Sequence, residues 1–276
     1  MSTNIWDIAN INDHDGTKKL LSPFKLNRTI KQPSAEELKT LAELYRERKL
    51  TKKVIYYYTK ALTLREQSLG YVHNLTANSC ADLANAYYED GDISKAISLY
   101  EKALLIKETL LDKNHLEIAV ICHKLADIYF DGNRLEKAHQ LYKKALKIRV
   151  KSLGNHLLTA SSYQILGFFY ASTKEYMLSS VLFEKALHVR KSLLEENHAD
   201  IATTHNNLGL SYYYIGEYQK AYDNVAKSIA IREKILEPKD KALLSSKSHL
   251  KMIYGELKRA KRKNRKPLFG LLSCRG

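Results

Sequence analysis

The chain has 276 residues, a formal net charge of +15 and 45% hydrophobic residues, so it is long enough to bury a sizeable core. No apolar run approaches the ~18 residues of a membrane-spanning helix, and the polar N-terminus lacks the layout of a secretory signal. The three cysteines, Cys80, Cys122 and Cys274, do not make a disulfide framework, so we expect an intracellular, cytoplasmic protein.

The first element is expected after residues 1–33, a stretch rich in Asn, Asp, Gly and Lys that predicts a flexible arm. Ser34 and Glu37 have the spacing of a capping box, which indicates a helix start. That helix is expected to end near Arg48, and a second one is expected over 51–69. Together they form a degenerate first repeat over 34–70, because terminal repeats of a stacked array are usually atypical.

Four well-formed repeats follow, over residues 73–113, 115–153, 156–195 and 198–237. Each copy begins at a histidine, and the spacings are 42, 41 and 42 residues: His73, His115, His156 and His198. One register position in each copy holds leucine and the next holds a small residue: Leu83 and Ala84, Leu125 and Ala126, Leu166 and Gly167, Leu208 and Gly209. Small residues let two helix axes approach closely, so the pattern predicts stacked helix pairs. A repeat of this length indicates a solenoid.

The turn between the two helices of a repeat is predicted at Gly91, Asn133 and Gly216, residues that accept a positive φ. Lys174 holds the same place in the repeat over 156–195, and Ser179 replaces the alanine of other copies. We therefore expect that repeat to have a different turn or a looser packing.

Residues 239–256 are predicted to form a single capping helix that covers the preceding repeat. Residues 257–276 form a basic tail, since eight basic residues and no acidic residue occur from Lys258 onward. Pro267 is expected to end any helix that enters this tail.

These repeats resemble the tetratricopeptide repeat, and their ~42-residue period, with phrases such as KALKIR, resembles the kinesin-light-chain type. The resemblance covers roughly residues 34–256. It implies an all-α, right-handed α-solenoid of antiparallel helix pairs, with five pairs and the capping helix. It also implies a non-catalytic scaffold or adaptor that binds a peptide segment of another protein in a concave groove.

No cluster of residues indicates catalysis. Adjacent repeat histidines lie a whole repeat apart, whereas zinc ligands lie ~2 Å from the metal, so we expect these histidines to cap helices. Cys80 and Cys122 share a register position with Tyr163 and His205, which suggests a buried slot. The sequence shows no nucleophile–base pair and no phosphate-binding loop. We therefore expect no enzyme, no cofactor, no metal and no small-molecule substrate.

By the same resemblance, one stripe of the first helix in each pair lines the groove. The candidate contact residues are Asn78, Asn85, Tyr88, His123, Asp127, Phe130, Gln164, Phe168, Thr203, Asn206, Leu210 and Tyr213. Asn and Gln can pair with an extended backbone, and aromatic rings suit anchor side chains. The stripe lacks the Lys/Asn pairs of a chaperone-tail carboxylate clamp, which disfavours that ligand. The alternative is that some stripe residues only fill the inside of the solenoid.

The tail supports an alternative function, in which the repeats act as a spacer. Its basic residues are Lys258, Arg259, Lys261, Arg262, Lys263, Arg265 and Lys266. They suit nucleic-acid phosphates, a nuclear import signal or, with the apolar residues that follow, an anionic membrane surface. Cys274 is a candidate for lipidation, which would add a second membrane anchor. The simplest alternative is a solvated helix end.

The resemblance gives one further hypothesis, since kinesin-light-chain-like grooves accept tryptophan-acidic peptides. Trp6 is the only tryptophan and precedes Asp7. This pair is therefore a candidate to dock in the protein's own groove or in a neighbour's. Alternatively, Trp6 packs with Ile5 and Ile8 on the end of the solenoid or stays disordered.

Overall fold

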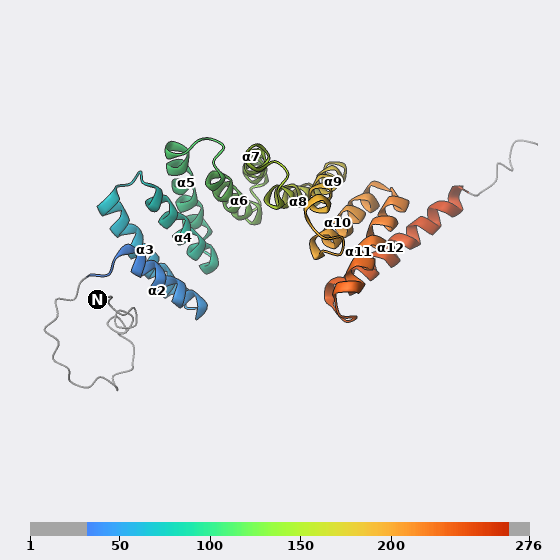
Figure 1. Ribbon diagram of the computed structural model, residues 1–276, viewed down its shortest axis with the longest axis horizontal. Coiled ribbons are helices and arrows are strands. Elements are labelled where there is room, and N and C mark those ends of the chain that lie inside the picture. Colours follow the sequence, from blue (N-terminus) through green and yellow to red (C-terminus); the bar gives the residue numbers. More distant parts are fainter. Residues whose placement is uncertain (1–31, 265–276) are drawn as a thin grey trace, which may run out of the picture. The chain divides into compact units, whose positions relative to one another are not determined.

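The computed structural model describes residues 32–264, and over this range the chain forms eleven α-helices and no strand (Figure 1). The predicted all-α repeat fold is confirmed. The chain divides into two compact units between Leu141 and Tyr142, and this boundary falls inside one helix. The N-terminal arm with Trp6 and Asp7 lies outside the described residues.

Unit 1 is built from successive helix pairs. Its helices are α2 (Ala35–Glu47), α3 (Thr51–Leu69), α4 (Asn74–Asp90), α5 (Ile93–Leu110), α6 (Leu116–Asp131) and the start of α7 (Leu135–Leu153). From α2 to α6, each helix packs against the one that precedes or follows it along the chain. The short turns between partners are typical of αα-hairpins.

Unit 2 continues the same plan. It holds the end of α7, then α8 (Leu157–Ser172), α9 (Tyr176–Leu193), α10 (Ala199–Ile215), α11 (Tyr218–Ile235) and α12 (Lys241–Asn264). Helices α8 to α12 pack in sequence order, and α10 also contacts α12.

The predicted helix starts are confirmed. Ser34 and Glu37 form a capping box in which each side chain bonds the other residue's backbone N–H. All four repeat histidines are N-caps, and the Nδ1 atom of each accepts from the backbone N–H two residues on, at 3.0–3.3 Å: His73, His115, His156 and His198. This satisfies one of the amide donors left open at each helix start.

The turn of the fourth repeat corrects one expectation. Lys174 takes a φ of 65°, in the same left-handed region as Gly91, Asn133 and Gly216. Its hydrogen bonds also match, since Glu175 N donates to Tyr170 O at 2.8 Å, as Glu217 N does to Tyr212 O at 3.0 Å. The expected different turn is therefore wrong. The bond from Glu175 N, with one from Lys174 N to Ala171 O at 3.1 Å, holds the lysine in a conformation that costs it ~1–2 kcal/mol.

The packing of that repeat is not looser at Ser179 either. Ser179 is fully buried, and its hydroxyl lies 3.0 Å from the hydroxyl of Ser211 on α10. The two hydroxyl groups hydrogen-bond to each other inside the interface, which explains how serine can replace alanine there.

The small residues of the repeat face large ones from the partner helix. A Cβ on Gly167 would lie 2.9 Å from the ring of Phe183. A Cβ on Gly209 would lie 2.5 Å from Val225 Cγ2 and 3.0 Å from Ala221 O. The two backbones therefore approach as closely as the large/small pattern predicts.

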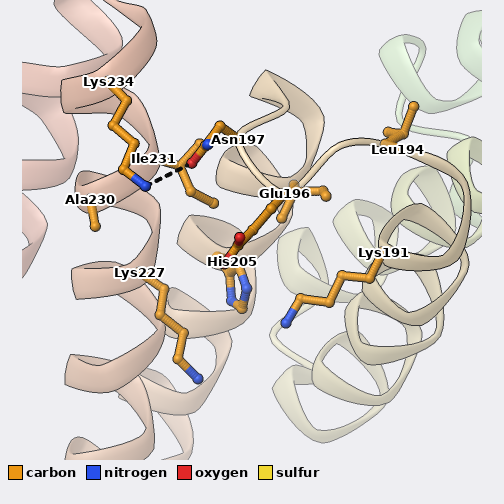
Figure 2. A pocket seen from close by; sticks show the side chains of 10 residues that line it. Lys191, Leu194, Glu196, Asn197, His205, Lys227, Ala230, Ile231 and Lys234 are labelled. Carbon is orange, nitrogen blue, oxygen red and sulfur yellow. Dashed lines mark hydrogen bonds between the residues drawn. The ribbon is translucent and has the colours of Figure 1, made fainter.

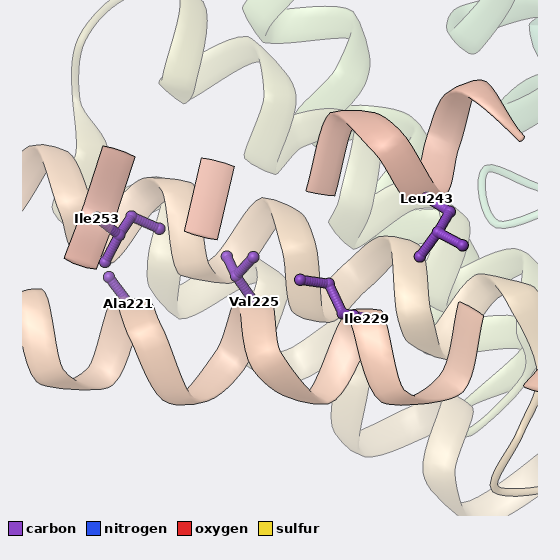
Figure 3. Packing of buried hydrophobic residues seen from close by; sticks show 5 residues of the cluster. All are labelled: Ala221, Val225, Ile229, Leu243 and Ile253. Carbon is purple, nitrogen blue, oxygen red and sulfur yellow. The ribbon is translucent and has the colours of Figure 1, made fainter. Parts of the chain in front are cut away.

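Helix α12 covers the last helix pair, as a capping helix should. Leu243 and Ile253 from α12 pack on Ala221, Val225 and Ile229, which follow one face of α11 (Figure 3). The helix begins at Lys241 and continues to Asn264, eight residues beyond the predicted end at 256. Leu257 is 8% exposed, so the packed part also extends past that predicted boundary.

Candidate peptide-binding face of the first helices

The predicted contact residues lie on the first helices of four pairs, and we call this set the candidate face. In unit 1 they lie on α4 and α6, and in unit 2 on α8 and α10. Helical periodicity places residues three and four apart on one side of a helix, so within each helix the members share a side. Their surroundings differ between the units.

In unit 1, polar members of the face are hydrogen-bonded within the chain. Tyr100 donates to Asn85 Oδ1 at 2.5 Å, and the Tyr88 hydroxyl donates to the carboxylate of Asp131. The bond to Asp131, together with burial, raises the pKa of Tyr88 to about 12. Asn78 is half-buried, and its side chain makes no hydrogen bond with any residue that the structure describes. Its amide therefore remains open to a partner.

Ion pairs cross the same part of unit 1. Lys39 Nζ on α2 lies 3.1 Å from Asp82 on α4, and Arg46 Nε lies 3.4 Å from Glu89. His123 and Asp127 on α6 are 3.6 Å apart, one helical turn from each other. Phe130, on the same helix, is half-buried. Lys39 and Arg46 thus offset the carboxylates of Asp82 and Glu89, while the contact of His123 with Asp127 is an ion pair only when the imidazole is protonated.

In unit 2, the face is more apolar. Phe168 is 46% exposed although its ring packs edge-on against Phe183, with centroids 5.4 Å apart. Tyr213 and Leu210 on α10 are half-buried, and the ring of Tyr213 lies 5.3 Å from that of Tyr214. Phe168, Leu210 and Tyr213 thus leave partly open apolar area on the first helices of unit 2.

Three predicted members of the face in unit 2 bond to neighbouring helices. Gln164 accepts from Arg190, and Thr203 accepts from Arg232 Nη2 at 3.3 Å. Asn206 is only 7% exposed and accepts from Ser246 Oγ at 3.0 Å and His249 Nδ1 at 3.1 Å. Asn206 therefore fills the interface between α10 and α12. This agrees with the alternative interpretation of the stripe, in which some of its residues only fill the inside of the solenoid.

The structure shows a series of buried basic residues that the sequence analysis does not predict. One basic residue near the end of each second helix is less than 9% exposed, at the repeat period: Arg65, Lys107, Arg149, Arg190 and Arg232. Within each unit, such a cation donates to the first helix of the following pair. Arg65 donates to Ser79 Oγ at 2.6 Å, and Arg149 donates to Ser162 Oγ at 2.6 Å. Periodicity alone would have shown the series, but a charged residue is usually assumed to be exposed.

The cysteines and the possible metal sites and membrane spans can also be compared with the structure. Cys80 and Cys122 are buried, and burial raises the pKa of the Cys80 thiol to about 11. Among residues 32–264 no group of three His, Cys, Asp or Glu side chains could hold a metal ion. No helix in that range is long and apolar enough to cross a membrane.

Part of the predicted tail belongs to α12. Arg259 pairs with Glu256 at 2.5 Å, and Lys261 Nζ donates to Gln219 Oε1 at 3.3 Å. Lys258 and Arg262 are helical, and Lys263 lies in the last turn. Arg265, Lys266 and Cys274 lie outside the described residues.

The repeat pattern matches a known family over most of the chain. The tetratricopeptide-repeat family model matches residues 34–109, 81–151 and 157–234. The chain belongs to the tetratricopeptide-repeat family. Repeats of this family are generally non-catalytic and serve as scaffolds for protein interaction, which supports the predicted class of function at that level. No curated protein sequence matches the chain.

Several solved structures share this tetratricopeptide architecture. BtubC (BKLC) from P. vanneervenii is 29% identical, with a TM-score of 0.65 over 75% of this chain and 83% of that one. A putative kinesin light chain from Podosopora anserina with nearly identical TPR-like repeats is 21% identical, with a TM-score of 0.65 over 72% and 95%. The apo form of RapI is 18% identical, with a TM-score of 0.66 over 82% and 59%. The predicted resemblance to kinesin-light-chain-type repeats is confirmed, and the last two likenesses concern the fold alone.

Proposed function

We propose that this tetratricopeptide-repeat protein is a non-catalytic adaptor, and that it binds a peptide segment of a partner protein against its candidate face. The observation that carries the proposal is the exposure of Phe168, an aromatic ring that packs on Phe183. Such a fixed ring offers apolar area at little entropic cost, which is typical of interface anchors. The polar members of the face in unit 2, Gln164, Thr203 and Asn206, are already hydrogen-bonded.

In unit 2, Tyr213 would add to the surface that Phe168 offers, and in unit 1, Tyr88 and Phe130 would offer rings of their own. Tyr213, Tyr88 and Phe130 are each half-buried, so their rings are positioned by the fold and still partly open. Asn78 would add an amide that can donate to and accept from an extended backbone. Gln164 and Thr203 would support the face from beneath, through their bonds to Arg190 and Arg232.

The test is quantitative affinity capture with the full chain and with a Phe168→Ser, Tyr213→Ser double variant. Partners that require the face should be lost from the double variant. The matched control is Leu105→Ser with Met177→Ser, which removes two more exposed apolar side chains, 66% and 65% exposed, from second helices. Equal capture by the wild type and the face variant, or loss in the control alone, would contradict the proposal.

The alternative role of the tail is tested by deleting residues 258–276. If localisation and partner capture both survive the deletion, the tail hypothesis fails and the candidate face remains. The same preparation should be checked for helix content, because the deletion also removes the last turns of α12.

A further inference from the structure

Two adjoining clefts lie in unit 2, between α9 and α11 and over one side of α10. Their volumes are about 430 and 390 Å³, within the range of small ligand sites. They share Lys191, His205 and Lys227, so they form one continuous feature, which we call the trough.

The trough lies on a different side of α10 from the candidate face. Its floor includes Ile201, His205 and Leu208, which are spaced four and three residues apart and so share one side of the helix. Tyr213 and Leu210 of the candidate face lie on another side, since each residue turns the helix by about 100°. A ligand in the trough would therefore be separate from a peptide on the face.

The chemistry of the trough is apolar with free positive charge. Leu194, Ile201 and Ile231 line the first cleft. Lys191 and Lys227 reach across it from opposite sides, with His205 between them (Figure 2). The ammonium group of neither lysine makes a hydrogen bond or salt bridge with any residue in the described part of the chain.

The same position in unit 1 holds a salt bridge. Lys102 is the counterpart of Lys227, and Glu66 is the counterpart of Lys191, at the repeat spacing. Lys102 Nζ and Glu66 Oε1 form a salt bridge of 2.6 Å, close enough to Cys80 that both charges act on its thiol. Cys80 is itself the counterpart of His205. In unit 2 the carboxylate of this pair is missing, and a second ammonium group takes its place.

We propose that the trough binds an acidic peptide segment of a partner protein, with a carboxylate placed between Lys191 and Lys227 as Glu66 is placed beside Lys102. The carboxylate of the partner then takes the place that the carboxylate of Glu66 has beside Lys102 in unit 1. Apolar residues of the segment then lie on Leu194, Ile201 and Ile231. This second site goes beyond the function proposed for the candidate face.

Other charged groups in the trough are consistent with this assignment. Lys234 is held by Asn197 Oδ1 at 3.1 Å, and Glu196 forms no salt bridge with either free lysine. In the second cleft, Glu184 accepts from the Tyr212 hydroxyl and Asp223 from Gln219. The first cleft thus has three lysines against one glutamate, which makes it the more cationic end.

The length of the trough suits a short extended segment. Its lining runs from Glu184 on α9 to Leu194, the C-cap of that helix, which is about 15 Å at 1.5 Å per residue. An extended chain rises about 3.3 Å per residue, so roughly five residues span this distance. Two apolar residues and two acidic residues in alternation would place apolar groups on the floor and carboxylates toward the lysines.

The test uses the full chain and a fluorescent peptide of sequence SLELES, acetylated and amidated, with SLQLQS as the neutral counterpart. Fluorescence anisotropy at low salt should show binding of SLELES, and added salt should weaken it. Lys191→Glu recreates the pair seen at Glu66 and Lys102, so it should weaken SLELES binding about tenfold or more. The same variant should unfold at an equal or higher temperature than the wild type, which excludes loss of the fold as the cause.

Two matched controls locate the site. Lys251→Glu makes the same charge change at an exposed lysine of α12 and should leave binding unchanged. Tyr213→Ser alters the candidate face and should also leave SLELES binding unchanged. The imidazole NMR signals of His205, assigned with a His205→Tyr variant, should shift when SLELES is added.

The proposal is overturned if the wild type does not bind SLELES, or if SLQLQS binds as well. It is also overturned if Lys191→Glu binds like the wild type, if Lys251→Glu loses as much affinity, or if Tyr213→Ser alone abolishes binding. Inorganic phosphate that shifts the His205 signals where SLELES does not would assign the trough to a phosphate ligand instead of a peptide.

Discussion

At the residue scale, two glycines mark where helix backbones come closest. Gly209 lies against Val225 and Ala221, and Gly167 lies against the ring of Phe183. In both places the side chain of the partner helix occupies the space that a Cβ would need. The pair of residues, small on one helix and large on the other, fixes how the two helices of a hairpin cross.

Gly209→Ala should therefore destabilise the protein. The new Cβ would sit 2.5 Å from Val225 Cγ2, and such overpacking costs ~1–3 kcal/mol, which the better helix propensity of alanine offsets by ~1 kcal/mol. Urea unfolding followed by circular dichroism measures the change. Gly255→Ala is the control: no atom lies within 4 Å of its Cβ, so it should stabilise the protein by ~0.5–1 kcal/mol. A stabilised Gly209→Ala variant would contradict this account of the interface.

Burial at His205 links stability to pH. Desolvation lowers the pKa of this histidine in the folded state; the hydrogen bond to Asn224 opposes the shift, and Lys191 and Lys227 add smaller contributions that lower the pKa further. The unfolded chain therefore binds a proton more readily, and acid favours unfolding. Burial also lowers the pKa of His249, beside Arg232, so both histidines act in the same direction.

Stability should accordingly fall as the pH drops below ~6.5, the ordinary value for histidine. His205→Tyr, the residue found at the matching position 163, should make this fall shallower because one of the two protonating groups is gone. Thermal unfolding at several pH values between 5 and 8 measures it. An unchanged pH profile in the variant would show that His205 is as easily protonated in the fold as in the unfolded chain.

At the scale of helices, the buried cations join one hairpin to the next. Arg190, on α9, donates to Gln164 on α8, to Thr204 on α10 and, at 3.3 Å, to Asp200 O. One guanidinium group thus holds three helices, and its planar set of donors suits several acceptors at once. Burial lowers the pKa of Arg190, and the nearby Asp200 carboxylate opposes that shift.

Arg190→Met should lower the free energy of unfolding by ~1–3 kcal/mol, because it leaves buried acceptors without a donor. Arg190→Lys should lose less, since Lys107 occupies the same position in an earlier repeat and bonds Asn74 and Glu117. Chemical denaturation of both variants gives the comparison. Lys147→Met, at an exposed position on α7, should change stability by no more than ~0.5 kcal/mol. Equal loss in the lysine and methionine variants would argue against the hydrogen-bonding role.

The sequence predicts these helices well because their positions follow from local rules. Period, capping residues and turn residues place each hairpin within a few residues of its observed bounds. Two features could not be seen in one stripe, because the first depends on packing between helices and the second on backbone hydrogen bonds around a turn. Asn206 is buried only because Ser246 and His249 come from α12 to meet it, and Lys174 adopts a glycine-like turn because the flanking hydrogen bonds require it.

The candidate face was predicted by register, and the trough was not predicted at all. Register identifies which side of a helix is left over after packing, so it places Phe168 and Tyr213 on a partly open surface. The trough depends on Lys191 and Lys227, which lie 36 residues apart on two different helices. Nothing in the local sequence of either lysine indicates that the other faces it.

At the scale of the whole molecule, stability is distributed along the array. From α2 to α6 and from α8 to α12, packing links helices that are close in sequence, which is the behaviour expected of a repeat array. The end of such an array has no further repeat to cover it. Helix α12 serves this role in unit 2, where Leu243 and Ile253 pack on α11 and Leu257 is also buried.

A chain that ends at residue 264 should therefore be as stable as the full chain, whereas one that ends at the predicted boundary of 256 should lose about 2 kcal/mol. The shorter chain lacks Leu257, whose burial is worth ~1.5–3 kcal/mol, and the bond from Lys261 to Gln219. Thermal unfolding of the full chain, the chain that ends at 264 and the chain that ends at 256 measures this difference in stability. Equal melting temperatures for all three would place the true end of the array before Leu257.

Glu66 and Lys191 hold the same position in two copies of the repeat, and this difference bears on how repeat proteins evolve. Codons for glutamate and lysine differ only at their first base, so duplicated repeats are a single mutation away from exchanging one for the other. In one copy the glutamate closes a salt bridge with Lys102, and in another the lysine leaves two cations open. Gene duplication supplies spare copies of a stable hairpin, and a point mutation in one copy is enough to turn an internal bond into a place for another molecule.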